Sequence, residues 1–139
     1  MSILKNLLKN PSYGKNIDLS LLLLRVAAGG FMLSHGYGKM VKLFNGTFEF
    51  ADPIGLGVEL SLVLTVFSEV LCALFIVLGI LPRFAAIPLI ITMVVIVFVV
   101  HASDGFGKQE LPLFYLISYV VILLLGGGKY SLQRLFSKG

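Results

Sequence analysis

Two ionisable side chains lie deep inside long apolar stretches of this chain, Arg25 in LLLLRVAAGG and Glu69 in SEVLCALFIV. A charge at the centre of a bilayer costs about 2.5 to 3.5 kcal/mol on insertion scales, so such a residue needs a partner or a ligand. At about 1.5 Å per helical residue, Arg25 lies about 9 Å and Glu69 about 16 Å from the same end of two antiparallel helices. The offset of about 7 Å is within an arginine's reach, so we expect an Arg25–Glu69 ion pair.

The role of this pair stays open at the level of sequence. A buried ion pair can fix the register of two helices and take no part in chemistry. The same two charges can instead form the floor of a binding cavity. A carboxylate held by Arg25 should then stay ionised until a ligand breaks the pair.

A second group of reactive side chains lies near the ends of the apolar stretches. His35 and Lys39 are one helical turn apart, His101 follows a third apolar stretch, and Tyr115 and Tyr119 are one turn apart in a fourth. Imidazole exchanges protons near neutral pH and an ammonium attracts anions, so these residues indicate a site for a quinone or a small polar substrate. Ordinary interfacial residues and an aromatic belt are the alternatives.

The sequence gives little support for a metal or a covalently bound cofactor. No HxxxH or HxxE spacing puts two ligands on one helix, so we expect no metal site. The single cysteine, Cys72, excludes an internal disulfide and a CxxC redox couple. The chain also has no haem-ligand pair and no dinucleotide-binding loop. Electrons for any redox reaction must therefore come from a bound quinone or another subunit.

The composition is that of a membrane protein. The 139 residues are 58% hydrophobic and 13% charged, with a mean hydropathy of +0.99, whereas soluble domains contain about 25% charged residues. The net charge of +4 is not accompanied by a basic aromatic stripe or a groove-reading motif, so we expect no nucleic-acid partner. We expect a single domain over residues 1–139 with the lipid bilayer as its surroundings.

Four stretches reach the roughly 20 residues that a transmembrane helix needs: 18–38, 59–80, 84–101 and 111–127. Asp18 marks the start of the first, and a short helix is expected before Pro11. Gly79 and Pro82 lie in a connection so short that the second and third spans must form an antiparallel hairpin. The predicted fold class is an all-α integral membrane four-helix bundle with antiparallel helices.

Two small-residue faces predict how the first two spans pack. Span one carries a stripe of Arg25, Gly29, Met32, Gly36 and Lys39. Span two carries a face of Ser61, Thr65, Ser68 and Cys72, with Glu69 at its edge. Because small and hydroxyl residues allow close helix approach in lipid, we expect these two surfaces to face each other.

Lysine and arginine predict that both termini are cytoplasmic. Seven of these residues lie on the side of the termini and three on the other side, and cytoplasmic loops carry the excess of positive charge. The seven are Lys5, Lys9, Lys15, Arg83, Lys129, Arg134 and Lys138, and the three are Lys39, Lys42 and Lys108.

Taken in order, these residues resemble the DoxX family of small four-helix bacterial membrane proteins. The likeness covers residues 19 to about 127 and rests on LLLLRVAAGGFMLSHGYGKM, on SEVLCALFIVLGILPRFAA and on a third span ending in VH. The matching positions are Arg25, His35, Gly36, Lys39, Glu69, Gly79, Arg83 and His101. The resemblance implies a multi-pass protein of the bacterial inner membrane linked to quinone-dependent oxidation of sulfur compounds or to redox-partner complexes.

We therefore expect a redox-associated membrane subunit that binds a quinone or a small reduced substrate between spans one, two and four. In this hypothesis Lys39 attracts an anionic substrate, His35 or His101 exchanges protons, and a partner protein takes the electrons. One alternative is a structural or assembly protein without a ligand, acting through partner docking or a homo-oligomer. A small-molecule transporter is less favoured, because no broken helix or inverted repeat is visible.

Overall fold

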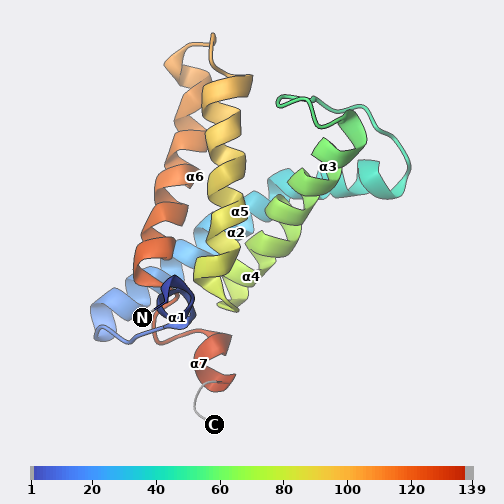
Figure 1. Cartoon of the computed structure of the whole chain (residues 1–139). Coiled ribbons are helices and arrows are strands. Elements are labelled where there is room, and N and C mark those ends of the chain that lie inside the picture. The colour runs from blue at the N-terminus through green and yellow to red at the C-terminus, as the bar shows by residue number, and fades with distance from the viewer. Residues whose placement is uncertain (1, 137–139) are drawn as a thin grey trace.

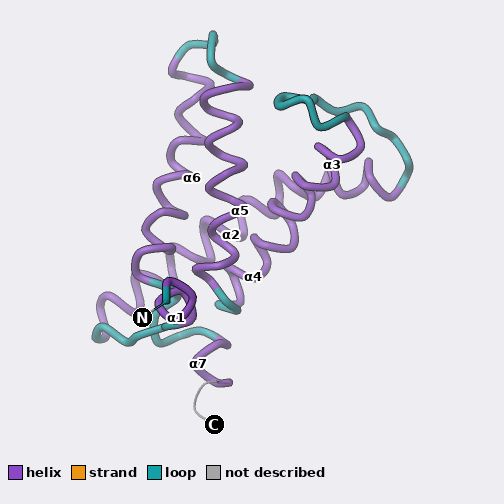
Figure 2. The backbone as a smooth tube through the Cα atoms, in the orientation of Figure 1, coloured by secondary structure: helices purple, strands orange, loops and turns teal. Residues whose placement is uncertain are grey.

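The computed structural model describes residues 2–136, and the regular structure in that range is all helical (Figures 1 and 2). Four helical segments are long and apolar enough to cross a membrane: Lys15–Phe44, Val58–Leu78, Pro82–Val100 and Phe106–Leu125. The predicted fold class and the four spans are thus confirmed. The first span is longer than expected, because it begins at Lys15 and ends at Phe44. Lys138, used above to predict orientation, lies outside the described residues.

Two of the four spans contain a π-helical segment. The second span comprises α3 (Val58–Val66), the π-helix η1 (Phe67–Cys72) and α4 (Ala73–Leu78), and the third comprises α5 (Pro82–Val95) and the π-helix η2 (Ile96–Val100). The first and fourth spans are α2 (Lys15–Phe44) and α6 (Phe106–Leu125). The short helix α1 (Ile3–Leu8) was expected, whereas α7 (Leu132–Phe136) was not.

The spans pack as two helix pairs that meet at one end and diverge at the other (Figure 1). Helix α2 packs along α3, η1 and α4, and α5 packs along α6. We call the end formed by residues 79–81 and 126–131 the closed end, and the end that carries loops 45–57 and 101–105 the open end. Toward the open end, α2 and α3 lean away from α5 and α6.

Two glycines on α2 set its register against the second span. A Cβ atom at Gly29 would lie 2.6 Å from Val77 Cγ2 and 2.8 Å from the backbone oxygen of Ala73. A Cβ atom at Gly36 would lie 2.8 Å from the backbone oxygen of Glu69. All three distances are below van der Waals contact, so only glycine at these two positions allows the two backbones to approach this closely. Gly36 is therefore level with Glu69.

The π-helical turns were not predicted from the sequence. In η1 the N–H of Ala73 bonds to the carbonyl of Ser68, and at the end of η2 the N–H of His101 bonds to the carbonyl of Ile96 at 2.9 Å. Each bond spans five residues instead of four, which widens the turn and changes the face on which later side chains lie. Such turns occur frequently at functional sites, and these two carry Glu69 and precede His101.

The packing surface predicted for span one is correct, but the one predicted for span two is wrong. Four of the five stripe residues, all but Lys39, are buried, and α2 packs against α4 and η1 as expected. The hydroxyl face of span two, however, turns toward α5, where Thr92 Oγ1 and Ser68 Oγ form a hydrogen bond of 2.8 Å. Thr65 bonds to the carbonyl of Ser61 in its own helix. The hydroxyl groups thus have partners away from α2, and backbone carbonyls face the glycines instead.

The close approach at Gly36 predicts a selective loss of stability. Gly36→Ala should lower the free energy of unfolding by about 1 to 3 kcal/mol, because the added methyl group pushes α2 away from the Glu69 backbone. Thermal unfolding in mild detergent, followed by circular dichroism, measures this. Gly38→Ala on the same helix is the control, because a Cβ atom there meets nothing within 4 Å. Equal effects of the two substitutions would contradict the proposed contact.

Candidate functional site

Arg25 is used at the closed end of the molecule, where it binds backbone carbonyl groups. Its side chain is 1% exposed and donates to the carbonyl oxygens of Gly127 at 2.7 Å, Tyr130 at 2.8 Å and Val77 at 3.4 Å. The guanidinium therefore links α2 to the last turn of α4 and to the segment after α6. The prediction that Arg25 pairs with Glu69 is wrong in this structure.

The register explains why the two charges do not meet. Glu69 is level with Gly36, and Arg25 comes eleven residues before Gly36 on the same helix. At the usual rise that separation is about 16 Å along the axis, beyond the reach of an arginine side chain. The sequence estimate was too short because it placed the start of α2 level with the end of α4. In the structure, Arg25 itself lies beside Gly79.

Other polar side chains complete the closed end. Asp18 is fully buried and accepts hydrogen bonds from the backbone N–H groups of Tyr13 at 3.1 Å and Lys129 at 3.2 Å. Asn10 accepts a bond of 2.7 Å from the N–H of Gly127. The prediction that Asp18 marks the start of α2 is wrong, because α2 begins at Lys15. Asp18 instead ties the first turn of that helix to the segment after α6. Apart from Arg25 Nε, which has no hydrogen-bond partner within the described residues, the polar atoms named here are bonded within the protein, which indicates a structural role.

Glu69 pairs with Lys39 toward the open end. The Lys39 Nζ atom lies 2.6 Å from Glu69 Oε2, and the side chains are 28% and 2% exposed respectively. A carboxylate this deeply buried needs a cation to remain charged. Lys39 had been assigned to a separate surface site, so the structure joins the two sequence-predicted groups through this pair.

A pocket of about 350 Å³ opens beside the ion pair, and we call it the polar pocket. Its lining brings together most of the reactive side chains singled out from the sequence. It comprises Met32, His35, Lys39, Glu69, Met93, Ile96, His101, Gly107, Lys108, Leu111, Pro112 and Tyr115. Tyr119 does not line it, because its hydroxyl group is buried and donates to the carbonyl of Ala28 at 2.9 Å.

His35, Tyr115 and Lys39 in this pocket have unused hydrogen-bonding capacity. The rings of His35 and Tyr115 meet edge to face, with centroids 5.8 Å apart. Within residues 2–136, neither the His35 ring nor the Tyr115 hydroxyl group forms a hydrogen bond. Lys39 has three N–H donors and gives one to Glu69. The pocket thus offers hydrogen-bond donors to a ligand oxygen, next to an apolar wall.

His101 marks the mouth of the pocket. Its Nδ1 atom lies 2.7 Å from Asp104 Oδ2, and its backbone carbonyl accepts a bond of 2.7 Å from Gln109. The hydrogen bond with His101 holds the pKa of Asp104 below its usual value, and the positive charge of Lys108 acts in the same direction. Asp104 therefore stays ionised at neutral pH and can accept a hydrogen bond from the His101 ring.

The described residues contain no cluster of three or more His, Cys, Asp or Glu side chains that could hold a metal ion. The chemistry of the polar pocket is that of hydrogen bonding and proton exchange. The side chains that can donate are two ammonium groups, a phenol and two imidazoles, and the one buried acceptor among the lining residues is the Glu69 carboxylate. This set suits a ligand that carries oxygen acceptors.

A family model and a curated relative match this chain. The family model described as DoxX matches residues 20–102, which include most of the first span and all of the second and third. An uncharacterized protein of Haemophilus influenzae is 32% identical over 75 residues, covering 51% of this chain and 50% of the relative. The chain thus spans about half the length of the curated relative it matches. No solved structure matches the chain.

The closed-end contacts predict that Arg25 is needed for stability independently of Glu69. Arg25→Met should lower the free energy of unfolding by about 3 kcal/mol, because three backbone carbonyl groups lose a charged donor. Adding Glu69→Gln should not restore that loss, since the two residues do not touch. Unfolding in detergent checks both points, with Lys15→Met as the control on the exposed start of α2. Recovery of stability in the double variant would contradict this prediction and support the Arg25–Glu69 ion pair expected from the sequence.

The open-end pair predicts the opposite behaviour for Lys39 and Glu69. Lys39→Met should cost about 2 to 3 kcal/mol of unfolding free energy, because it leaves a buried carboxylate without a cation. Combining it with Glu69→Gln should recover most of this loss, since no charge is then left unpaired. A double-mutant cycle measured by unfolding gives the coupling energy. Strict additivity of the two single effects would rule out the pair.

Proposed function

We propose that this chain, which belongs to the DoxX family of membrane proteins, binds the head group of a quinone in its polar pocket. The observation that carries the proposal is the Lys39–Glu69 pair in the pocket wall. A buried carboxylate positions the ammonium, whose remaining N–H groups can donate to a ligand carbonyl oxygen. The Tyr115 hydroxyl group supplies a second donor nearby.

The apolar part of the pocket suits a flat ring. Met32 and Met93 are 2% exposed and line the pocket together with Ile96 and Leu111. Thioether groups make favourable contacts with ring systems and adapt to their shape. A pocket that is mostly apolar with a few directed donors is typical of small-molecule sites in proteins.

Glu69 favours a neutral ligand over a small anion. An anionic sulfur compound would have to approach Lys39 while the carboxylate lies 2.6 Å from the same ammonium, and two like charges in a poorly solvated site repel each other. A quinone carries carbonyl acceptors and no charge, so it can share Lys39 with Glu69. This supports a quinone over the small reduced anion that the sequence left open.

Proton exchange would be the task of the two histidines. Reduction of a quinone to a quinol takes up protons with the electrons, and imidazole is the side chain that exchanges protons near neutral pH. His35 and His101 both line the polar pocket. The electrons would come from a partner protein, and we propose the bacterial inner membrane as the location, with both termini cytoplasmic.

A structural or assembly role is the competing proposal, and the closed end favours it. Arg25 and Asp18, the two most deeply buried charges there, are used for holding segments together. In that case the polar pocket would be a by-product of helix divergence. Native mass spectrometry of the protein purified in mild detergent separates the two, because a ligand-free protein supports the structural role and a copurified quinone opposes it.

The proposal predicts loss of binding in variants that still fold. Glu69→Gln should abolish binding of a decyl-substituted benzoquinone, because Lys39 loses the carboxylate that positions it, and adding Lys39→Met should not restore binding, because the charged donor is then lost as well. Isothermal titration calorimetry in detergent measures the affinity. The double variant is the informative one, because its stability is expected to be close to that of the unmodified protein.

Glu59→Gln is the matched control, since Glu59 is an exposed carboxylate on the same span and lines neither pocket. Its affinity for the quinone should equal that of the unmodified protein. Unchanged quinone affinity in the Glu69→Gln variant would remove the polar pocket from consideration as the binding site.

A further inference from the structure

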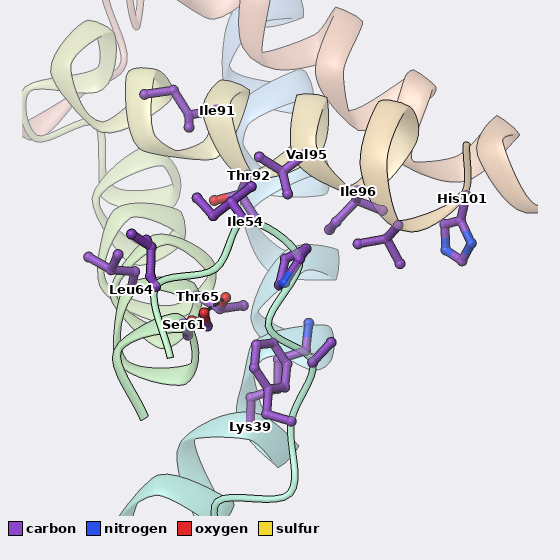
Figure 3. A pocket seen from close by; sticks show the side chains of 15 residues that line it. Lys39, Ile54, Ser61, Leu64, Thr65, Ile91, Thr92, Val95, Ile96 and His101 are labelled. Carbon is purple, nitrogen blue, oxygen red and sulfur yellow. Dashed lines mark hydrogen bonds between the residues drawn. The ribbon is translucent and has the colours of Figure 1, made fainter. Parts of the chain in front are cut away.

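A second pocket, of about 320 Å³, is lined by Lys39 as the polar pocket is (Figure 3). We call it the apolar pocket, because its lining is dominated by hydrocarbon side chains from α3, α5, η2 and the loop before α3. Phe50, Ile54, Leu64, Ile91 and Val95 are among them.

The hydroxyl groups of the apolar pocket are engaged within the protein. Ser61 donates to Asp52 at 3.1 Å, Thr65 donates to the carbonyl of Ser61 at 2.7 Å, and Thr92 lies 2.8 Å from both the carbonyl of Pro88 and Ser68 Oγ. Few polar atoms are therefore left to bind a ligand head group. The pocket suits a hydrocarbon chain.

The two pockets are neighbours that share part of their walls. Lys39, Ile96 and His101 line both of them. The polar pocket lies between α2 and α6, and the apolar pocket lies between α3 and α5, so together they follow the divergence of the two helix pairs. A molecule with its head at Lys39 can thus extend past Ile96 into the apolar pocket.

The apolar pocket opens sideways, at a depth where lipid surrounds the helices. Leu64 on α3 and Ile91 on α5 line it, yet they are 45% and 59% exposed. Leu64 follows the first residue of α3 by six positions, which is about 9 Å along the helix. The rim formed by these two side chains therefore lies within the apolar length of the spans.

We infer that the two pockets hold one molecule, with its head group in the polar pocket and an alkyl or isoprenoid tail in the apolar pocket. The ligand class is a tailed, membrane-dissolved compound that enters between α3 and α5, and not a water-soluble one that enters from the open end. This inference rests on the proposed function for the head group and adds the tail, its location and its route.

The tail gains little from the hydrophobic effect, because lipid and pocket are both apolar. The tail contributes by orienting the head group, and this contribution is lost when a protein side chain fills the apolar pocket. Val95→Phe fills the apolar pocket from α5. Val94→Phe is the matched control, because Val94 is the adjacent residue, is 39% exposed and lines neither pocket.

The experiment compares a decyl-substituted benzoquinone with the same head group lacking the tail, by calorimetry on the full chain in detergent. Val95→Phe should weaken the tailed compound by about tenfold, as expected for a steric clash of 1 to 2 kcal/mol, and leave the tailless one unchanged. Val94→Phe should change neither affinity. Using the ratio of the two affinities cancels the unequal partitioning of the probes into micelles.

Three other outcomes would overturn either the tail site or the proposed function. Unchanged affinity for both probes in Val95→Phe, with the variant folded by circular dichroism, overturns the tail site and leaves the proposed head-group function standing. An equal loss for both probes also overturns it, because the substitution then acts on the head-group pocket. Failure of the unmodified protein to bind either probe overturns the proposed function, and the tail site with it.

Discussion

The hydrogen bonds from Arg25 to backbone carbonyls hold the closed end together, and the rest of the architecture depends on them. One guanidinium joins α2, the last turn of α4 and the segment after α6. A buried charge is stable here because several carbonyl dipoles replace its water. With one end secured in this way, the helix pairs can diverge at the other end without the bundle separating, and that divergence creates the two pockets.

The second constraint is the contact of Gly36 with the backbone of Glu69. The glycine lets α2 approach the π-helical turn η1, and this contact fixes the level at which the carboxylate meets Lys39. The residues that stabilise the fold at the closed end are thus different from those that line the polar pocket. Arg25 Nη1 and Nη2 and the Asp18 carboxylate at the closed end are bonded within the protein, whereas His35 and Tyr115 at the polar pocket retain unused hydrogen-bonding capacity within the described residues.

Much of this was predictable from the sequence, and the parts that failed share a physical cause. Hydropathy and length alone located the four spans, and residue chemistry selected His35, Lys39, Glu69, His101 and Tyr115, which the structure brings into one pocket. The pairing of Arg25 with Glu69 failed because axial register depends on which small residues let two backbones meet. Hydropathy does not carry that information, although Gly29 and Gly36 were visible as candidates. The partners of Arg25 were hidden for another reason, since backbone carbonyls have no sequence signature. Tyr119 was misplaced because an i,i+4 pair shares a helix face but not a depth.

The π-helical turns have a consequence for how such chains can vary. A π-turn contains one more residue than an α-turn, so it amounts to a single-residue insertion absorbed without breaking the helix. Removing one residue from Phe67–Cys72 would restore α geometry within that segment and leave the two flanking halves of the span in place. The residue at the position of Glu69 would then face elsewhere while both helix ends kept their places. The number of residues in this short segment, and not only their identity, therefore decides whether an acidic side chain reaches the polar pocket.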